Sequence, residues 1–132
     1  MIYYTWKKGE QRHLSRNFAT YEFECPCTYP DCVEQRINVA LVDNLQKVRD
    51  DVNDTVSITS AYRCTKYHLD LTKRGYKTVV NSQHVLGNAA DVVSRNMTSL
   101  GGAVHKYFMA VGVARNFFHV DERRDKLRSW TY

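Results

Sequence analysis

The sequence predicts an α+β fold in which helices pack on one face of a small antiparallel sheet. Two observations support this class: segments whose apolar residues recur at helical spacing, and several short segments with the alternation or β-branched content of strands. The length of 132 residues suits a single domain over residues 1–132. The composition, 43% hydrophobic and 25% charged, is typical of a folded globule and not of a disordered chain.

The first half of the chain is expected to contain one long helix and one short strand. Residues 1–24 are mixed aromatic and polar, and we expect them to wrap the core. The CPCTYPDC stretch that follows is predicted to be a loop, because its two prolines interrupt any regular element. Apolar residues then recur with helical spacing, which predicts an amphipathic helix over residues 37–52. The alternating segment VSITS, residues 56–60, predicts a strand.

The middle of the chain combines a short helix with a loop and a strand. Residues 65–73 are expected to form a brief helix, which Gly75 ends as a C-terminal cap. Residues 76–88 carry the turn-forming pairs that are typical of a loop. The apolar run over residues 89–93 predicts a buried strand.

The last third is expected to contain a second long helix, a strand and a final short helix. The helix is predicted over residues 98–111, despite two glycines near its start. Aromatic and β-branched residues predict a strand over residues 117–121. The charged tail ERRDKLRSWTY, residues 122–132, is expected to form the final helix.

The charge balance favours an anionic partner. Nineteen Lys and Arg residues against 14 Asp and Glu give a formal net charge of +5, which suits nucleic acid, a membrane surface or an anionic cell wall. Nucleic-acid binding rests on this charge alone, because no helix-turn-helix, zinc finger or aromatic-basic platform supports it. No apolar run approaches the roughly 18 residues of a membrane span, and the N-terminus lacks the pattern of a secretory signal. We expect a protein made in the cytoplasm, with no nucleic-acid or membrane partner.

The four cysteines, Cys25, Cys27, Cys32 and Cys64, are too few for a disulfide scaffold. They allow three disulfide pairings, among which the sequence cannot choose. A structural zinc site is possible, although the single-residue gap between Cys25 and Cys27 is tighter than common zinc spacings. Reduced structural thiols are the first expectation. A zinc site, or a disulfide that joins Cys64 to the N-terminal segment, is the alternative.

The segment SQHVLGNAADVV, residues 82–93, contains the clearest metal-binding pattern. His84 and Asp91 are separated by small residues, which are needed where backbone or metal comes close. Downstream, in FFHVDER, His119 and Asp121 would project from the same face of a strand. Histidine nitrogen and aspartate oxygen are normal zinc ligands. His84, Asp91 and His119 therefore make a plausible three-ligand site with one open position.

The same residues resemble a known family. Ser82, His84, Gly87, Ala89 and Asp91 match every fixed position of the SxHxxGxAxD signature of the zinc D-alanyl-D-alanine carboxypeptidase family. That family includes vancomycin-resistance dipeptidases and phage L-alanyl-D-glutamate endolysins, and is related in fold to the hedgehog signalling domain. LSRNFATYEFECPC resembles the N-terminal segment of its Streptomyces-type branch. ITSAYRC resembles a family strand that ends in arginine, and FFHVDER resembles the strand of the third ligand.

The resemblance implies a zinc peptidase that hydrolyses a peptide bond next to a D-amino acid in the peptidoglycan stem peptide, either D-Ala-D-Ala or L-Ala-D-Glu. One zinc ion would be bound by the three ligands and would activate a water molecule. Arg63 would polarise the scissile carbonyl or stabilise the oxyanion, and Ser82 would contact substrate or orient its loop. Such a chain suits a phage lysin or a virion-borne hydrolase that acts at the bacterial cell wall, with other virion or lysis proteins as partners.

One position departs from the family pattern. Many members have Asp or Glu three residues before the third ligand as general base, whereas this sequence has Asn116. Asp121 is the substitute candidate, either as the base or as the carboxylate that fixes the tautomer of a ligand histidine. Glu122 should point the other way. The alternative function is therefore a catalytically weak or inactive binding or structural domain, such as a phage virion component. The remaining histidines match no motif and are expected at the surface or at helix caps: His13, His68 and His105.

Overall fold

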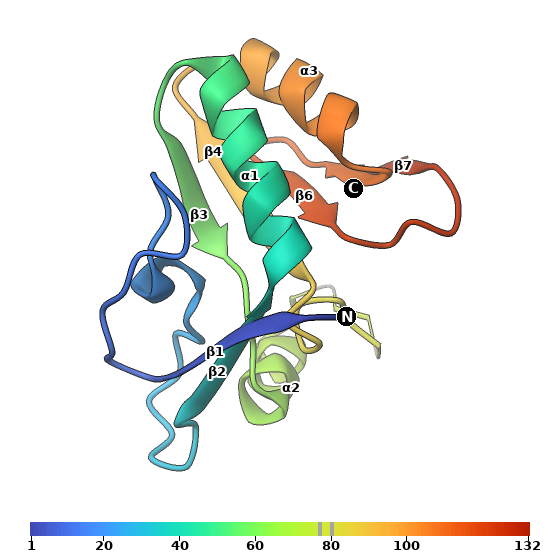
Figure 1. Ribbon diagram of the computed structural model, residues 1–132. Helices are drawn as coiled ribbons and strands as arrows, with labels where there is room; N and C mark the ends of the chain where they lie inside the picture. Colours follow the sequence, from blue (N-terminus) through green and yellow to red (C-terminus); the bar gives the residue numbers. More distant parts are fainter. Residues whose placement is uncertain (77, 80) are drawn as a thin grey trace.

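The computed structural model contains a five-stranded sheet (Figure 1), and it describes residues 1–76, 78–79 and 81–132. The strands are, in chain order, β3 (Val56–Ser60), β4 (Ala89–Ser94), β5 (Ala110–Val113), β6 (Phe118–Asp121) and β7 (Arg128–Thr131). They are arranged as β3-β4-β6-β5-β7. Neighbouring strands are antiparallel except β7, which is parallel to β5 at the edge of the sheet. The predicted fold class is confirmed, with one parallel edge strand added.

Two long helices cover one face of this sheet. Helices α1 (Val39–Val52) and α3 (Met97–Tyr107) pack against each other over the sheet (Figure 1). The apolar face of α1 is fully buried at Leu41, Leu45 and Val48, as its periodicity predicts. Helix α1 has 14 residues, and no helix in the described part of the chain is both long and apolar enough to span a membrane.

The N-terminal segment forms a second, two-stranded antiparallel sheet from β1 (Tyr3–Lys7) and β2 (Glu34–Asn38), with a 3-10 turn, η1 (Thr20–Phe23), between the two strands. The side chains of Trp6, Phe18 and Phe23 from this segment are buried in the core. The expectation that the first 24 residues wrap the core is therefore confirmed for these three side chains.

The short helix α2 (Thr65–Lys73) lies apart from α1 and α3. Helix α2 follows β3 after a short connection (Figure 1), as predicted. The backbone N–H of Tyr67 donates to Cys64 Sγ at its N-terminal end. Gly75, just past its C-terminal end, has a positive φ of 89°, which explains the glycine at this position. The described residues of the predicted loop 76–88 contain no helix or strand, and Lys77 and Val80 lie outside the described residues.

Two predicted helix boundaries and one predicted element type are wrong. The long helix expected from residue 37 begins two residues later, because Ile37 and Asn38 belong to β2 and the Asn38 side chain caps α1 by accepting from Ala40 N. The helix expected to reach residue 111 ends at Tyr107, and the chain continues as β5. The expected tail helix is instead β7, in which Trp130 pairs with Gly112 across the ladder. Long-range strand pairing overrides local sequence preference in β2, β5 and β7.

Gly112 is required for the packing of β7. A Cβ added to Gly112 would lie 2.7 Å from Trp130 Cε2, closer than carbon atoms normally approach. We expect Gly112→Ala to reduce the free energy of unfolding by about 1–3 kcal/mol, because the indole must move to make room. Urea denaturation followed by circular dichroism measures this loss.

Gly102 supplies the matched control. It lies in α3, and an added Cβ would meet nothing within 4 Å. Gly102→Ala is therefore expected to stabilise the fold by about 0.5–1 kcal/mol, since alanine is the better helix former. Equal stability of the two variants would show that Trp130 does not pack on Gly112.

Candidate metal centre

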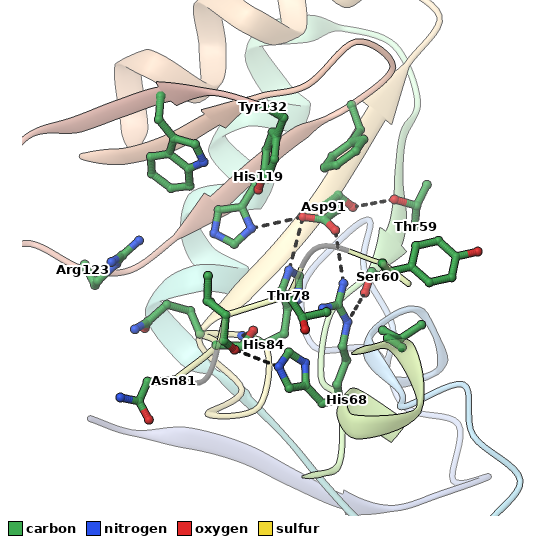
Figure 2. Close-up of a pocket in the computed structure, with 18 of the residues that line it drawn as sticks. Thr59, Ser60, His68, Thr78, Asn81, His84, Asp91, His119, Arg123 and Tyr132 are labelled. Atoms are coloured by element: carbon green, nitrogen blue, oxygen red, sulfur yellow. Dashed lines mark hydrogen bonds and ion pairs between the residues drawn. The ribbon is translucent and has the colours of Figure 1, made fainter. Parts of the chain in front are cut away.

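The three predicted ligands converge on one point of the sheet (Figure 2). Asp91 of β4 and His119 of β6 are directly paired across the antiparallel ladder, and His84 comes from the loop that leads into β4. Asp91 Oδ1 lies 3.3 Å from His84 Nε2 and 3.2 Å from His119 Nδ1. All three side chains are buried. The structure therefore brings together the residues that the sequence separates by seven and 28 positions.

Each histidine is oriented by a hydrogen bond at its other ring nitrogen. His84 Nδ1 lies 2.8 Å from the carbonyl oxygen of Ala61. A carbonyl only accepts, so Nδ1 carries a proton and Nε2 is the ring nitrogen that faces Asp91. His119 Nε2 lies 2.8 Å from Asp121 Oδ2, which leaves Nδ1 directed to Asp91 in the same way. This pattern of oriented imidazoles is typical of metal sites.

The donor set fits a zinc ion. The ligand atoms of His84, Asp91 and His119 all lie within 4.8 Å of one another. Two imidazole nitrogens and one carboxylate oxygen form a common catalytic zinc set, in which the fourth position is open to water or substrate. The geometry is therefore suitable for an ion at the point that the three side chains face.

The protonation states of His84 and Asp91 suit metal binding. Burial lowers the pKa of His84 and so favours the neutral imidazole that a metal needs. Burial disfavours the charge of Asp91, but hydrogen bonds with His119 and His84 outweigh it and hold the pKa of Asp91 below its usual range. The pKa of His119 is raised, because Asp121 and Asp91 outweigh the opposing effect of burial. The site thus contains an ionised carboxylate between two histidines at neutral pH.

Asp121 lies behind His119 and not in the cleft. Its side chain is fully buried. It accepts from Arg123 Nε at 2.9 Å and from Arg123 Nη2 at 2.9 Å, as well as contacting His119. Burial opposes its charge, but the bonds with His119 and Arg123 lower the pKa of Asp121 to about 2. This is the arrangement of a carboxylate that orients a ligand histidine.

The other two residues considered for the proton-transfer role lie outside the cleft. Asn116 is exposed in the connection between β5 and β6. Glu122 accepts from Asn44 Nδ2 at 3.0 Å and from Arg124 Nη2 at 2.9 Å. Among the described residues that line the cleft, Asp91 is the only carboxylate.

Arg63 and Ser82 lie beside the candidate metal centre. Arg63 Nη2 lies 3.6 Å from Asp91 Oδ2, and Arg63 Nε donates to Ser60 Oγ at 3.1 Å. The guanidinium is thereby held at the wall of the cleft. Ser82 is buried and its Oγ accepts from His84 N at 3.2 Å, so it supports the loop that carries the first ligand.

The cleft contains residues that the sequence did not indicate. Its volume is about 910 Å³. Trp130 and Tyr132, from the segment expected to be a helix, form one wall, and the Trp130 ring centroid lies 5.4 Å from that of His119.

The prediction that His68 is a surface or capping residue is wrong, because it is buried and lines the cleft. Leu71, three residues later on the same helix face, also lines the cleft, and this spacing was the available signal.

The remaining two histidines are outside the cleft, as expected. His13 and His105 are both exposed. His105 lies in the last turn of α3, and its Nδ1 lies 2.8 Å from the carbonyl oxygen of Gly101.

Two comparisons with known proteins bear on this site. The family model described as Peptidase M15 matches residues 16–121. The matched range contains the three candidate ligands and also Arg63 and Asp121. A search of curated proteins finds no match.

Proposed function

Because the chain belongs to the peptidase M15 family, whose members are zinc-dependent peptidases, we propose that it hydrolyses a peptide bond next to a D-amino acid in the peptidoglycan stem peptide. The bond is D-Ala-D-Ala or L-Ala-D-Glu, as in the carboxypeptidases and endolysins that the sequence resembles. The observation that carries the proposal is the convergence of His84, Asp91 and His119 in a cleft large enough for a short peptide.

The charge of the cleft supports an anionic peptide as substrate. Four basic side chains line it, Arg63, Arg123, Lys126 and Arg128, against the single carboxylate of Asp91 among the described lining residues. Asp121 and Asp125 pair with Arg123 and Arg128 from outside the cleft. Stem peptides carry free carboxylates at D-alanine or D-glutamate. A cleft of this charge attracts such groups over neutral peptides.

The metal ligands and Arg63 have different roles in the proposed reaction. When bound by His84, Asp91 and His119, a zinc ion supplies Lewis acidity and lowers the pKa of a coordinated water towards 7. Arg63, held by Ser60 and Asp91 at the cleft wall, donates to the scissile carbonyl oxygen as negative charge develops there.

Asp121 has a supporting role in this proposal. We assign it to the orientation of His119 and not to proton abstraction, because it is fully buried and bound to Arg123. Ser82 likewise holds the loop of His84 through the backbone N–H of that residue. Both are positioning residues.

The proposed place of action is the bacterial cell wall, in a lysis or virion setting. The net charge of +5 supports attraction to the anionic wall. Peptidoglycan is the proposed partner, together with other virion or lysis proteins.

A second candidate function is a binding or structural domain that keeps the metal but has little or no turnover. The lack of a carboxylate other than Asp91 among the described residues of the cleft wall supports it, because many family members use a further carboxylate as base. Metal content does not separate the two functions, whereas turnover does.

Hydrolysis of purified peptidoglycan by the zinc-loaded protein tests the proposal. We expect release of fragments whose masses identify the bond, either free D-alanine or peptides cut after L-alanine. His84→Ala is the control and is expected to release none, since it removes one ligand. A folded, zinc-containing wild-type protein that releases nothing would support the binding or structural function instead.

A further inference from the structure

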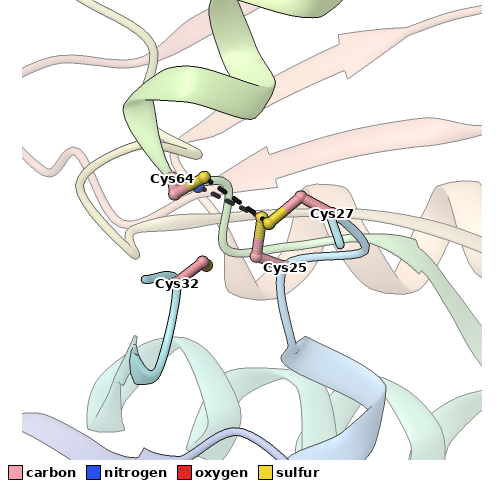
Figure 3. A group of neighbouring side chains, drawn as sticks. All are labelled: Cys25, Cys27, Cys32 and Cys64. Atoms are coloured by element: carbon pink, nitrogen blue, oxygen red, sulfur yellow. Dashed lines mark hydrogen bonds between the residues drawn. The ribbon is translucent and has the colours of Figure 1, made fainter. Parts of the chain in front are cut away.

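The four cysteines meet at a second place in the fold (Figure 3). Cys25 and Cys27 follow η1, Cys32 precedes β2, and Cys64 stands at the start of α2. Their sulfur atoms all lie within 4.8 Å of one another. One is buried, the other three are half-buried, and all four are free thiols. We propose that this cluster binds a structural zinc ion, separate from the candidate metal centre.

The sulfur spacing is that of a metal site and not of a disulfide. The sulfurs of Cys27 and Cys64 are 3.7 Å apart, whereas a disulfide bond is about 2.0 Å long. Four sulfurs at about 2.3 Å from a tetrahedral zinc ion lie about 3.8 Å from one another. The single residue between Cys25 and Cys27, Pro26, does not prevent their sulfurs from lying within 4.8 Å of each other.

Two of the sulfurs accept hydrogen bonds from backbone N–H groups. Cys64 N donates to Cys25 Sγ at 3.3 Å. Tyr67 N, in the first turn of α2, donates to Cys64 Sγ at 3.4 Å. Hydrogen-bond donors thus contact both sulfurs, as outer partners usually contact the ligands of a metal site.

The other two sulfurs accept from side chains. Gln35 Nε2 lies 3.4 Å from Cys32 Sγ, and Gln35 Oε1 accepts from Cys25 N at 2.8 Å. Gln35 is only 1% exposed, so a buried amide connects two of the cysteine segments. Lys8 Nζ lies 3.6 Å from Cys27 Sγ. Every sulfur thus has an N–H donor, and one donor is a cation that offsets the negative charge of a zinc–tetrathiolate.

The site would fix the element that carries Arg63. Three ligands belong to the N-terminal segment, and the fourth, Cys64, directly follows Arg63. A bound ion therefore ties the N-terminal segment to the cleft wall. Four thiolates in a closed tetrahedron form a structural zinc set, with no position open for water.

Metal counting with two variants tests the inference. Wild-type protein purified with zinc is expected to hold two ions per chain, one for each cluster. Cys32→Ser and His84→Ala are each expected to hold one. After replacement with cobalt, the sulfur-to-cobalt charge-transfer absorption should persist in His84→Ala and be lost in Cys32→Ser. If peptidoglycan hydrolysis fails, this result is unaffected, because it does not depend on turnover.

Thiol labelling of the wild-type protein covers the case in which Cys32→Ser does not fold. All four thiols are expected to resist alkylation with zinc bound and to react after chelation. Three results would each overturn the inference. These are a single ion that His84→Ala removes entirely, a disulfide detected by mass, or iron in place of zinc.

Discussion

Replacing Arg63 with alanine is expected to lower kcat for stem-peptide hydrolysis by about 10²–10³-fold while the zinc content stays unchanged. The guanidinium is not a candidate ligand, but Ser60 and Asp91 hold it at the cleft wall. A fixed cation at this point stabilises the charge that develops on the carbonyl oxygen. Steady-state hydrolysis and metal analysis of the same preparations measure the two effects.

Two further substitutions sharpen this test. Arg63→Lys keeps the charge but loses the planar fork, so we expect a rate between those of the wild type and Arg63→Ala. Arg95→Ala removes an exposed arginine that pairs with Asp54 outside the cleft, and its rate should equal that of the wild type. A loss of zinc in Arg63→Ala would mean that the arginine supports the metal site and does not act on the substrate.

Replacing Asp121 with asparagine is expected to weaken zinc binding at the candidate centre by about 10–100-fold. The carboxylate accepts from His119 and from Arg123 in a fully buried position. Asparagine keeps the shape but removes the charge that fixes the imidazole. Zinc competition with a chelating dye measures the affinity, and saturating zinc should restore most of the rate.

The rate at saturating zinc separates the two roles considered for Asp121. If zinc affinity is unchanged and the rate stays low in excess zinc, Asp121 acts as the general base. Glu122→Gln is the matched control, because Glu122 follows directly in sequence but contacts Asn44 and Arg124 outside the cleft. We expect no change in zinc affinity for this variant.

The candidate metal centre was predictable because its signals are local. Small residues between His84 and Asp91 indicate a close approach of the backbone, and the alternation around His119 indicates a strand. Both patterns extend over only a few positions. The strand pairing that sets Asp91 opposite His119 then follows from the antiparallel sheet. The hydrogen bond from His119 to Asp121 is likewise a contact between residues on one strand face.

The parts that the sequence missed, such as β7, or left open, such as the state of the cysteines, depend on distant contacts. β7 is short and follows a charged segment, and it is a strand because it pairs in parallel with β5 and places Trp130 over Gly112. The cysteine cluster needs Cys64 to meet residues more than 30 positions earlier. No periodicity or spacing rule reports contacts of this kind, since they are decided by how whole elements dock.

The positions of the two tryptophans have a practical consequence. Trp130 lies against His119 at the candidate metal centre. Trp6 donates to Glu24, the residue directly before Cys25 of the cysteine cluster. With only two tryptophans in the chain, replacing either one by phenylalanine leaves an intrinsic fluorophore next to a single cluster. We expect the emission of each variant to respond to the occupancy of the site beside its remaining tryptophan, without any attached label.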